Sequence, residues 1–208
     1  MFKTQSLFFT YNQQTAFRFP DIELAAGENL LVLGESGIGK TTLLHLMAGL
    51  LRPKSGSVEL MGTVLHDLSS ARLDSFRGKH IGLVFQRPYF VQALSLQENL
   101  ALVQFLAGKS RDKNRIKEVL NSLGIGHKLQ EKPHRLSQGE QQRAAIALAV
   151  INSPQLILAD EPTSSLDDKN CSKVAILLKE QASATGAQLI IITHDQRLKD
   201  QFQNAITL

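Results

Sequence analysis

The sequence predicts an α/β fold with an inserted helical subdomain, and three features of the chain indicate it. Four short apolar runs have the length and composition of buried core strands, at 30–33, 81–85, 156–159 and 188–192. The first run is followed by a glycine-rich loop and then by a segment with helical spacing. Between about 88 and 150 the strand signals stop and helical periodicity replaces them. We therefore expect a core of about 1–87 and 151–208, with a helical subdomain inserted between its two parts.

Composition and charge are typical of one globular domain over residues 1–208, with 43% hydrophobic and 20% charged residues. The longest all-apolar run, Ala144–Ile151, is too short to span a membrane, and the first residues lack the apolar stretch of a secretory signal. The single cysteine, Cys171, excludes an internal disulfide and fits a reducing compartment. The net charge of +4 comes from scattered basic residues without interleaved aromatics. This pattern favours a solvated surface around an anionic ligand, and we expect no nucleic-acid partner.

The N-terminal segment is expected to form β-structure with an aromatic side chain at its turn. Residues 2–9 and about 17–24 are predicted strands, joined by the polar stretch 11–14. Tyr11 stands 23 positions before Gly34, where its ring could lie against an adenine base. A tyrosine half-buried at the end of a strand is an equally good interpretation of this stretch alone.

The glycine-rich loop GESGIGKT at 34–41 matches the P-loop pattern G-x-x-x-x-G-K-[ST], with a strand before it and a helix after it. Its glycines let successive N–H groups point inward and form an anion-binding nest at the positive end of the following helix. Lys40 is placed to reach the β- and γ-phosphates of a nucleoside triphosphate, and the Thr41 hydroxyl to ligate Mg²⁺. A glycine turn that merely happens to contain a lysine is the alternative. The residues expected to contact the nucleotide are Gly34, Glu35, Ser36, Gly37, Ile38, Gly39, Lys40, Thr41 and Thr42.

A glutamine follows the next core strand. After the glycine and proline stop signal at 49–56, the sequence predicts a strand at 57–60 and a helix at 68–76. Gln86 then ends the strand at 81–85. Its long, uncharged side chain could both ligate Mg²⁺ and hold a water molecule, although a glutamine here is more often a plain loop residue.

The segment LSQGEQQR, at 136–143, introduces the last helix of the predicted helical subdomain. The predicted helices of this subdomain are at 96–106, 115–123 and 139–150. Ser137 is a suitable N-cap, and Glu140 three residues later completes a capping box. The Ser137 side chain and the Gly139 amide could also form a second phosphate-binding helix start. The structural and the functional interpretation are compatible.

Two adjacent carboxylates, Asp160 and Glu161, close the apolar strand at 156–159. In a chain with an upstream P-loop, the first is suited to hold Mg²⁺ and its water shell. The second is suited to take a proton from, or to orient, the water that attacks the γ-phosphate. Without that context, the pair would be an ordinary turn or helix start.

The C-terminal part repeats the strand and helix alternation. A rigid turn at 162–167 leads into a helix at about 169–184, and the strand at 188–192 follows. His194 lies just beyond that strand, where a neutral or protonated imidazole could bond the γ-phosphate. A last helix at 195–203 and a final strand at 205–208 complete the prediction.

Taken together, six segments resemble those of the ATP-binding cassette (ABC) ATPase family in order and spacing, over essentially the whole chain. They are GESGIGKT, VFQ, LSQGE, LILADEP, SSLD and ITHD. The resemblance implies a P-loop NTPase with a RecA-like core, an antiparallel β subdomain and an α-helical subdomain inserted at about 88–150. It implies that two copies sandwich two ATP with Mg²⁺, each site using Lys40 and Glu161 of one copy and Ser137 of the other. Asp167 is implied as a contact across the dimer, and Tyr11 as the adenine-stacking residue.

Within the family, GEQQR and LADEPT resemble the ATPase subunits of lipoprotein-release, macrolide-export and cell-division-type systems. This resemblance implies a homodimer that drives integral membrane subunits from the cytoplasmic face of the membrane, with Glu161, His194 and Gln86 in hydrolysis. The helical insertion and the loop at about 87–99 are the expected contact surface for those subunits. Neither the cargo nor the direction of transport follows from the sequence.

Three other functions stay open beside this one. Importer ATPases for amino acids share many of the same sequence motifs. Soluble ABC ATPases of repair or translation usually carry two cassettes or long coiled-coil insertions, and this sequence has neither. A small-molecule kinase with a P-loop would leave LSQGE and ITHD unexplained.

Three positions depart from the family pattern. Gln138 and Glu140 stand where LSGGQ is usual, and Gln138 replaces a glycine whose backbone freedom could matter for turnover. Leu148 occupies a place near which the family often has an arginine. Because that arginine usually lies outside the nucleotide contacts, we expect an effect on packing or on a partner.

Overall fold

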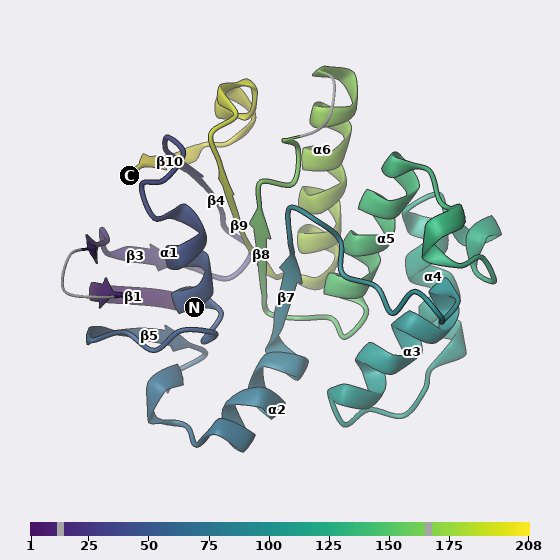
Figure 1. Cartoon of the computed structure of the whole chain (residues 1–208), viewed down its shortest axis with the longest axis horizontal. Coiled ribbons are helices and arrows are strands. Elements are labelled where there is room, and N and C mark those ends of the chain that lie inside the picture. The colour runs from purple at the N-terminus through teal and green to yellow at the C-terminus, as the bar shows by residue number, and fades with distance from the viewer. Residues whose placement is uncertain (12–14, 165–167) are drawn as a thin grey trace.

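A computed structural model describes residues 1–11, 15–164 and 168–208 and places them in two β-sheets with flanking helices (Figure 1). One sheet is parallel and forms the core, and the other is antiparallel. The predicted α/β fold is confirmed, with a group of helices between the second and third apolar segments of the core.

The core sheet contains five parallel strands in the order β10–β4–β9–β8–β7. Their bounds are β4 (Asn29–Leu33), β7 (Ile81–Val84), β8 (Leu156–Asp160), β9 (Gln188–Thr193) and β10 (Asn204–Thr207). Every residue of β8 and β9 is buried, as expected for a parallel sheet that is covered on both faces. Because the strands run in one direction, the segments that follow β4, β7, β8 and β9 all leave from the same edge of the sheet.

The second sheet is built on the long strand β1 (Phe2–Thr10), which pairs with three other strands. These are β2 (Ala16–Arg18), β3 (Ile22–Leu24) and β5 (Ser55–Leu60), and β6 (Thr63–Val64) pairs with β5. The β-structure predicted over about 17–24 is present as two short strands, because the chain leaves the ladder between β2 and β3. Pro20 lies in this break and has no N–H to donate to a neighbouring strand.

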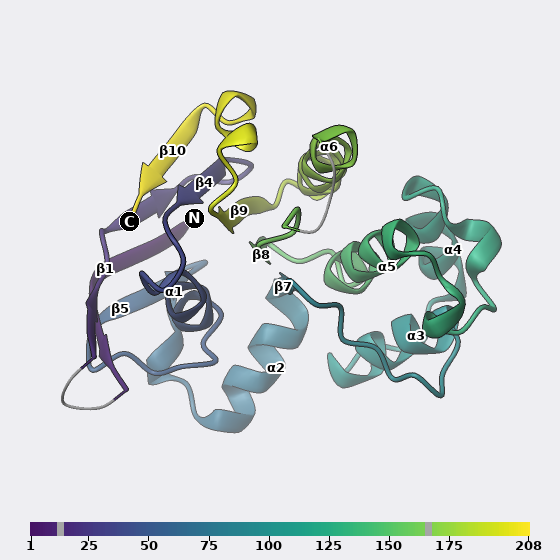
Figure 2. The ribbon, with the colours of Figure 1, turned by 45° about the horizontal axis from the view of Figure 1, so that its top comes forward.

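Six α-helices are described, and α3, α4 and α5 gather on the side of the molecule opposite the antiparallel sheet (Figure 2). Their bounds are α1 (Lys40–Met47), α2 (Ser70–His80), α3 (Leu96–Leu106), α4 (Lys113–Ser122), α5 (Gln138–Val150) and α6 (Asp168–Thr185). Four short 3-10 helices are η1 (Leu65–Asp67), η2 (Gly126–Lys128), η3 (Pro133–Arg135) and η4 (Gln196–Gln201). None of the described helices is long and apolar enough to cross a membrane.

Two predicted helices differ from the observed ones. The helix expected over 68–76 runs from Ser70 to His80, ending only where β7 begins. The last helix, expected over 195–203, is a 3-10 helix with Asp195 as its N-cap, whose side chain accepts a hydrogen bond from the Arg197 N–H. A single 3-10 turn connecting two strands satisfies its backbone locally without a full α-helical ladder.

The pleat of the core strands divides the hydrophobic core into two layers. Residues such as Leu31, Ile157 and Ile191 pack with α3, α4, α5 and α6. Their neighbours in the strands, such as Val32 and Ile192, pack instead with α1 and the antiparallel sheet. At Gly82 in β7 a Cβ atom would lie 2.3 Å from the Ala149 carbonyl oxygen, so glycine permits the close packing of β7 against α5. The sheet is therefore held firmly from both sides.

Candidate nucleotide site

The loop between β4 and α1 has the backbone that an anion nest needs. Gly37 and Gly39 have φ values of 86° and 102°, which lie in the left-handed region. Gly39 also has no room for a side chain, because a Cβ atom would lie 2.6 Å from the Phe17 ring. The loop is anchored to the core where the Gly34 N–H donates to the Thr193 carbonyl oxygen at 3.3 Å. The predicted loop is thus present between the predicted strand and helix.

Lys40 is turned into this loop and only 7% of its surface is exposed. Its Nζ donates to the carbonyl oxygens of Gly34 and Glu35, both at 2.8 Å. The same Nζ lies 3.4 Å from Oε1 of Glu161. A buried ammonium next to a carboxylate and at the base of a nest of N–H groups is suited to bind the phosphates of a nucleotide.

Asp160, at the end of β8, faces the first turn of α1. Its Oδ2 accepts a hydrogen bond of 3.0 Å from the Thr41 hydroxyl. Its Oδ1 is buried, and no described residue donates a hydrogen bond to it. Burial raises the pKa of the Asp160 carboxyl, the Thr41 hydrogen bond opposes this rise, and the nearby Glu161 adds to it. A hydroxyl beside a carboxylate with an unsatisfied oxygen fits the oxygen ligands that Mg²⁺ prefers.

Glu161 is held in an unusual backbone conformation, with φ of 47°. Such a left-handed conformation costs about 1–3 kcal/mol for a residue other than glycine. Its N–H donates to the Ile192 carbonyl oxygen at 2.8 Å, and its Oε2 accepts from the Thr193 hydroxyl at 2.8 Å. Its Oε1 accepts from the His194 N–H at 3.2 Å and lies 2.8 Å from His194 Nδ1. The end of β9 therefore fixes the direction of this carboxylate.

The electrostatics of Glu161 favour the ionised form. Burial raises the pKa of its carboxyl, but the hydrogen bonds from His194 and Thr193 and the charge of Lys40 lower that pKa by more. The net effect is a pKa below the ordinary value of a glutamate. An ionised, oriented carboxylate is what a general base needs.

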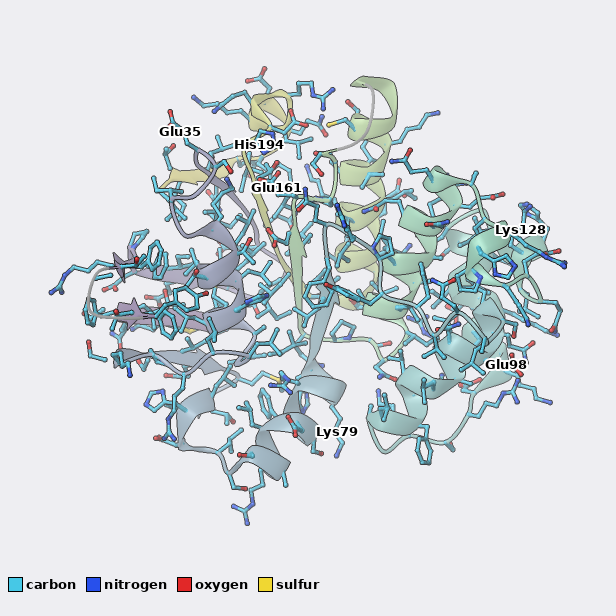
Figure 3. All side chains as sticks on the ribbon, viewed as in Figure 1. Glu35, Lys79, Glu98, Lys128, Glu161 and His194 are labelled. Atoms are coloured by element: carbon cyan, nitrogen blue, oxygen red, sulfur yellow. The ribbon has the colours of Figure 1, made fainter. Side chains whose placement is uncertain are left out.

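Lys40, Thr41, Glu161 and His194 line one open cleft of about 690 Å³ at the edge of the core sheet. Glu35, Glu161 and His194 lie together there, where the core strands end (Figure 3). Gln86 lies in the wall of the cleft, and its Nε2 donates to the Ser164 hydroxyl at 3.3 Å. The residues that line the cleft are Phe17, Glu35, Ser36, Gly37, Gly39, Lys40, Thr41, Thr42, Gln86, Glu161 and His194. The structure thus brings together most of the predicted site residues.

An aromatic group stands beside the cleft. Tyr11 is 59% exposed, and its hydroxyl lies 3.1 Å from Oγ1 of Thr42, which ties the tyrosine to α1. Its ring meets those of Phe9 and Phe17 edge to face, at centroid distances of 4.8 Å and 6.3 Å. Sequence analysis did not select Phe17, which lies in the cleft wall over Gly39. An alternating aromatic pattern from Phe17 to Phe19 is the only signal that could have drawn attention to it.

Six described residues of the predicted site are not among those that line this cleft, namely Tyr11, Gly34, Ile38, Asp160, Ser137 and Gly139. Ser137 and Gly139 stand at the start of α5 and are not among its lining residues. The predicted capping box is confirmed there, because the Ser137 N–H donates to Oε2 of Glu140 at 2.8 Å and the Glu140 N–H reaches Oγ of Ser137 at 3.4 Å. Asp167 lies outside the described residues.

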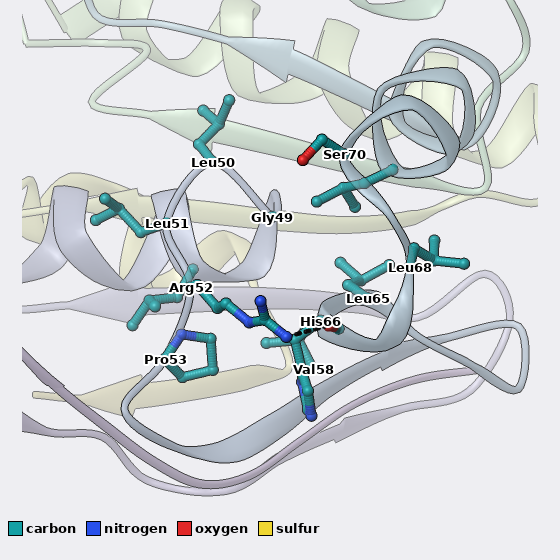
Figure 4. Close-up of a pocket in the computed structure, with 12 residues that line it drawn as sticks. Gly49, Leu50, Leu51, Arg52, Pro53, Val58, Leu65, His66, Leu68 and Ser70 are labelled. Carbon is teal, nitrogen blue, oxygen red and sulfur yellow. Dashed lines mark hydrogen bonds between the residues drawn. The ribbon is translucent and has the colours of Figure 1, made fainter.

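A second pocket, of about 200 Å³, lies between the end of α1, β5 and α2 (Figure 4). Most of its wall is aliphatic, with Leu50, Leu51 and Leu65 among the lining residues. Arg52 reaches across it and donates to the His66 carbonyl oxygen at 2.8 Å. It shares no lining residue with the nucleotide cleft and places no carboxylate opposite a nucleophile, so we do not assign it a catalytic role.

Comparison with known proteins gives the same result as the geometry. The sequence model of a family described as ABC transporter matches residues 19–164. The chain is 39% identical over 190 residues to a lipoprotein-releasing system ATP-binding protein LolD from a Shewanella species (strain MR-7), covering 90% of this chain and 82% of the relative. The LolD protein of Idiomarina loihiensis is 38% identical over 199 residues, covering 95% and 87%.

Solved structures agree with the fold. The dimeric structure of MJ0796, a bacterial ABC transporter cassette, has a TM-score of 0.88 and 30% identity, and covers 100% of this chain and 94% of its own. The same protein in a post-hydrolysis state bound to ADP and Pi matches equally well. The cbiO1 protein of Clostridium perfringens, part of the cbiONQ transporter complex, has a TM-score of 0.86 and 28% identity, and covers 99% and 83%. The chain therefore belongs to the ABC transporter family, as an ATP-binding and ATP-hydrolysing subunit.

Proposed function

We propose that this chain acts as a homodimer in which each ATP lies between the cleft of one copy and the start of α5 of the other. The position of Ser137 and Gly139 supports this arrangement, because neither lines the cleft that contains Lys40. The dimeric state named for the MJ0796 structures, one of them with ADP and Pi, gives independent support. On this proposal the site of a single copy is incomplete.

Lys40 and the P-loop amides bind the phosphates and stabilise the charge that develops during phosphoryl transfer. The Lys40 ammonium exchanges its two carbonyl partners for phosphate oxygens, which are stronger acceptors. Thr41, Gln86 and Asp160 would hold Mg²⁺, which would supply positive charge to neutralise the phosphates. Tyr11 stacks on the adenine, and Phe17 beside it extends the aromatic surface.

Glu161 orients the attacking water and takes its proton, and this is the role that the geometry supports best. The observation that carries it is the fixed carboxylate: Thr193 and His194 hold both oxygens, on a backbone with φ of 47°. Strain of this kind is retained where the surrounding structure over-determines it, as in active sites. His194 and Gln86 border the cleft and position the water and the γ-phosphate.

The Glu161→Gln variant tests this role. The amide keeps the size of the side chain but cannot accept a proton, so we expect hydrolysis to fall by about a hundredfold or more. ATP binding, measured by equilibrium fluorescence with a nucleotide analogue, should stay within about twofold of wild type. Glu98→Gln, which removes a carboxylate far from the cleft, is the matched control. Near wild-type turnover by the Glu161→Gln protein would contradict the assignment.

We further propose that the dimer drives integral membrane subunits of a lipoprotein-release or related export type, at the cytoplasmic face of the membrane. The similarity to LolD proteins supports this class of partner. The proposed contact with these membrane subunits lies in a groove of about 450 Å³ between α2, α3, α5 and β7. Its wall includes Phe85, Tyr89, Leu106 and Leu148, and Tyr89 is 74% exposed. Leu148, where the family often has an arginine, makes this groove more apolar.

A pull-down of the Glu161→Gln protein with ATP and Mg²⁺ in detergent tests this partner. Recovery of a membrane protein with few spans and a large domain outside the membrane is the expected result. Recovery of a permease with many membrane spans would instead indicate a conventional importer or exporter. Recovery of soluble protein only would contradict the transport role. Tyr89→Ser is the matched variant, and it should reduce recovery without changing hydrolysis by the isolated chain.

A further inference from the structure

We propose that Lys128 is a positioning residue that neutralises Glu140, so that the phosphate of the partner's ATP can approach Ser137. This inference rests on the proposed dimer and adds a residue that none of the six motifs contains. Three observations carry it: the place of the Glu140 carboxylate, the ion pair that reaches it from η2, and the absence of such a pair at a matched helix start.

The Glu140 carboxylate lies at the point where a phosphate is expected. Its Oε2 accepts from the Ser137 N–H at 2.8 Å and from the Ser137 hydroxyl at 2.9 Å. The side chain is only 15% exposed, so its charge is not fully screened by water. Hydrogen bonds from the Ser137 N–H and hydroxyl lower the pKa of Glu140, which keeps the carboxylate ionised. A phosphate at this helix start would therefore meet a like charge a few ångströms away.

The Ser137 hydroxyl cannot donate to Glu140 and to a phosphate at the same time, because it has one proton. When it turns to the phosphate, Glu140 keeps the Ser137 N–H but loses one of its two donors from this residue. Another donor, with a positive charge, is needed to hold the carboxylate back. Without one, Glu140 would compete with the phosphate for the same hydroxyl.

Lys128 supplies that charge. Its Nζ lies 3.4 Å from Oε1 of Glu140, on the carboxylate oxygen that Ser137 does not use. His127 Nε2 lies 3.9 Å from the same atom and adds charge when the imidazole is protonated. The backbone of η2 is well fixed, since the Lys128 N–H donates to the carbonyl oxygen of the fully buried Ile125 at 2.9 Å. In Figure 3, Lys128 lies on the side of the molecule that carries the helices of the helical subdomain.

The matched helix start at α3 shows that capping alone does not require such a pair. Glu98 caps Ser95 with the same bonds, at 2.8 Å and 2.7 Å. Within the described parts of the chain, no lysine, arginine or histidine nitrogen lies within 4.0 Å of the Glu98 carboxylate. Arg111 and Lys132 lower the pKa of Glu98 only from a longer range, after the bonds from Ser95. The close cation is thus specific to the helix start that the proposed dimer uses.

The test measures the KM for ATP and kcat of the full chain in low and high salt. For Lys128→Gln we expect KM to rise about threefold to tenfold at ~50 mM salt, and by less than about twofold at ~500 mM, where screening weakens the repulsion. Adding Glu140→Gln should return KM to within about twofold of wild type, because the like charge is then absent. Lys128→Arg should keep the wild-type value. Lys132→Gln, an exposed lysine in the same subdomain, is the matched control and should change nothing.

A purely structural role for Lys128 predicts a different result, namely a loss that persists in high salt and is not rescued by Glu140→Gln. That result would overturn the inference. A wild-type KM for Lys128→Gln would overturn it as well, provided that the Ser137→Ala protein is impaired. If Ser137→Ala hydrolyses ATP like wild type, the proposed shared site fails and this inference fails with it. Should Lys128→Gln not fold, Glu140→Gln alone decides: it leaves the Lys128 charge unpaired beside the phosphate, so its KM should be no higher than that of wild type at ~50 mM salt and should rise more steeply with salt. A KM that is higher than wild type at ~50 mM salt would overturn the inference.

Discussion

Helices α3 and α5 begin with the same serine–glutamate capping box, but only the capping serine of α5 is exposed to solvent. At α3, Ser95 is buried, and the N–H groups of Leu96 and Gln97 donate to the carbonyl oxygens of Glu131 and Leu129 at 2.9 and 3.0 Å. At α5, Ser137 is exposed. Over the described residues, no backbone carbonyl outside α5 accepts a hydrogen bond from the Gly139 N–H.

This difference teaches that a capping box by itself does not make a phosphate site. The helix start at α3 is satisfied by its own subdomain and serves the packing of α3 against the loop at 129–131. The helix start at α5 keeps an exposed Ser137 and an exposed Gln138, and it has a lysine that balances the box carboxylate. Exposure and charge compensation, which depend on tertiary structure, separate the two.

The largest expected effect comes from removing the two serines in turn and measuring activity. Ser137→Ala should lower kcat/KM for ATP by about tenfold to a hundredfold, because a donor to the phosphate is lost. Ser95→Ala should leave kcat/KM within about threefold of wild type, since its hydroxyl caps a buried helix start. Steady-state phosphate release at several ATP concentrations measures both. Equal losses for the two variants would break the comparison.

The loss of folding stability should be larger for Ser95→Ala than for Ser137→Ala, the opposite of the order expected for activity. Ser95→Ala should lower the free energy of unfolding by about 1–2 kcal/mol, because it leaves a buried helix start without its cap. Ser137→Ala should lower it by about 0.5–1 kcal/mol, since water can replace an exposed cap. Urea unfolding followed by circular dichroism gives both values. A larger loss for Ser137→Ala would show that α5, not α3, depends on its box.

The smallest expected effect is in the acid range, where the two boxes should behave alike. Bonds from the serine N–H and then the serine hydroxyl lower the pKa of both Glu98 and Glu140 below the reference value of 4.5. A pKa that is lower in the folded state stabilises the fold above about pH 4.5, and this stabilisation is lost as pH falls through the folded pKa. Glu98→Gln and Glu140→Gln should each make the unfolding midpoint fall less steeply between about pH 5 and 3. A flatter profile for only one of the two variants would show that the serine bonds lower the pKa of only one of the two glutamates.

Much of the fold and most of the nucleotide cleft could be predicted from the sequence, because they depend on local pattern. The core strands are apolar over their full length, and the P-loop has its glycines and lysine at fixed spacing. The φ of 47° at Glu161 could not be predicted, because Glu161 is held by hydrogen bonds from residues distant in the sequence. These are Thr193, at the end of β9, and His194, which follows it. Phe17 over Gly39 likewise joins two segments that are distant in the chain.

Where the structure departs from the predictions, the cause is again a contact between segments that are distant in the chain. The β-structure expected over 17–24 is divided into two strands because pairing with β1 decides which of its residues join the ladder. The sequence contains the pattern S-x-x-E at both helix starts, so a reader of the sequence has no local reason to separate them. The roles of Ser137 and Gly139 stay predictions, and the proposed role of Lys128 depends on a distance that no motif encodes.

The most direct test of the shared site is the mass of the Glu161→Gln protein in solution, measured by light scattering with and without ATP and Mg²⁺. Because this variant should bind ATP without hydrolysing it, we expect a single chain without ATP and twice that mass with it. Nucleotide retained by the protein is measured in the same sample. A protein that binds ATP and keeps the mass of one chain at every concentration would contradict a site completed by the second copy.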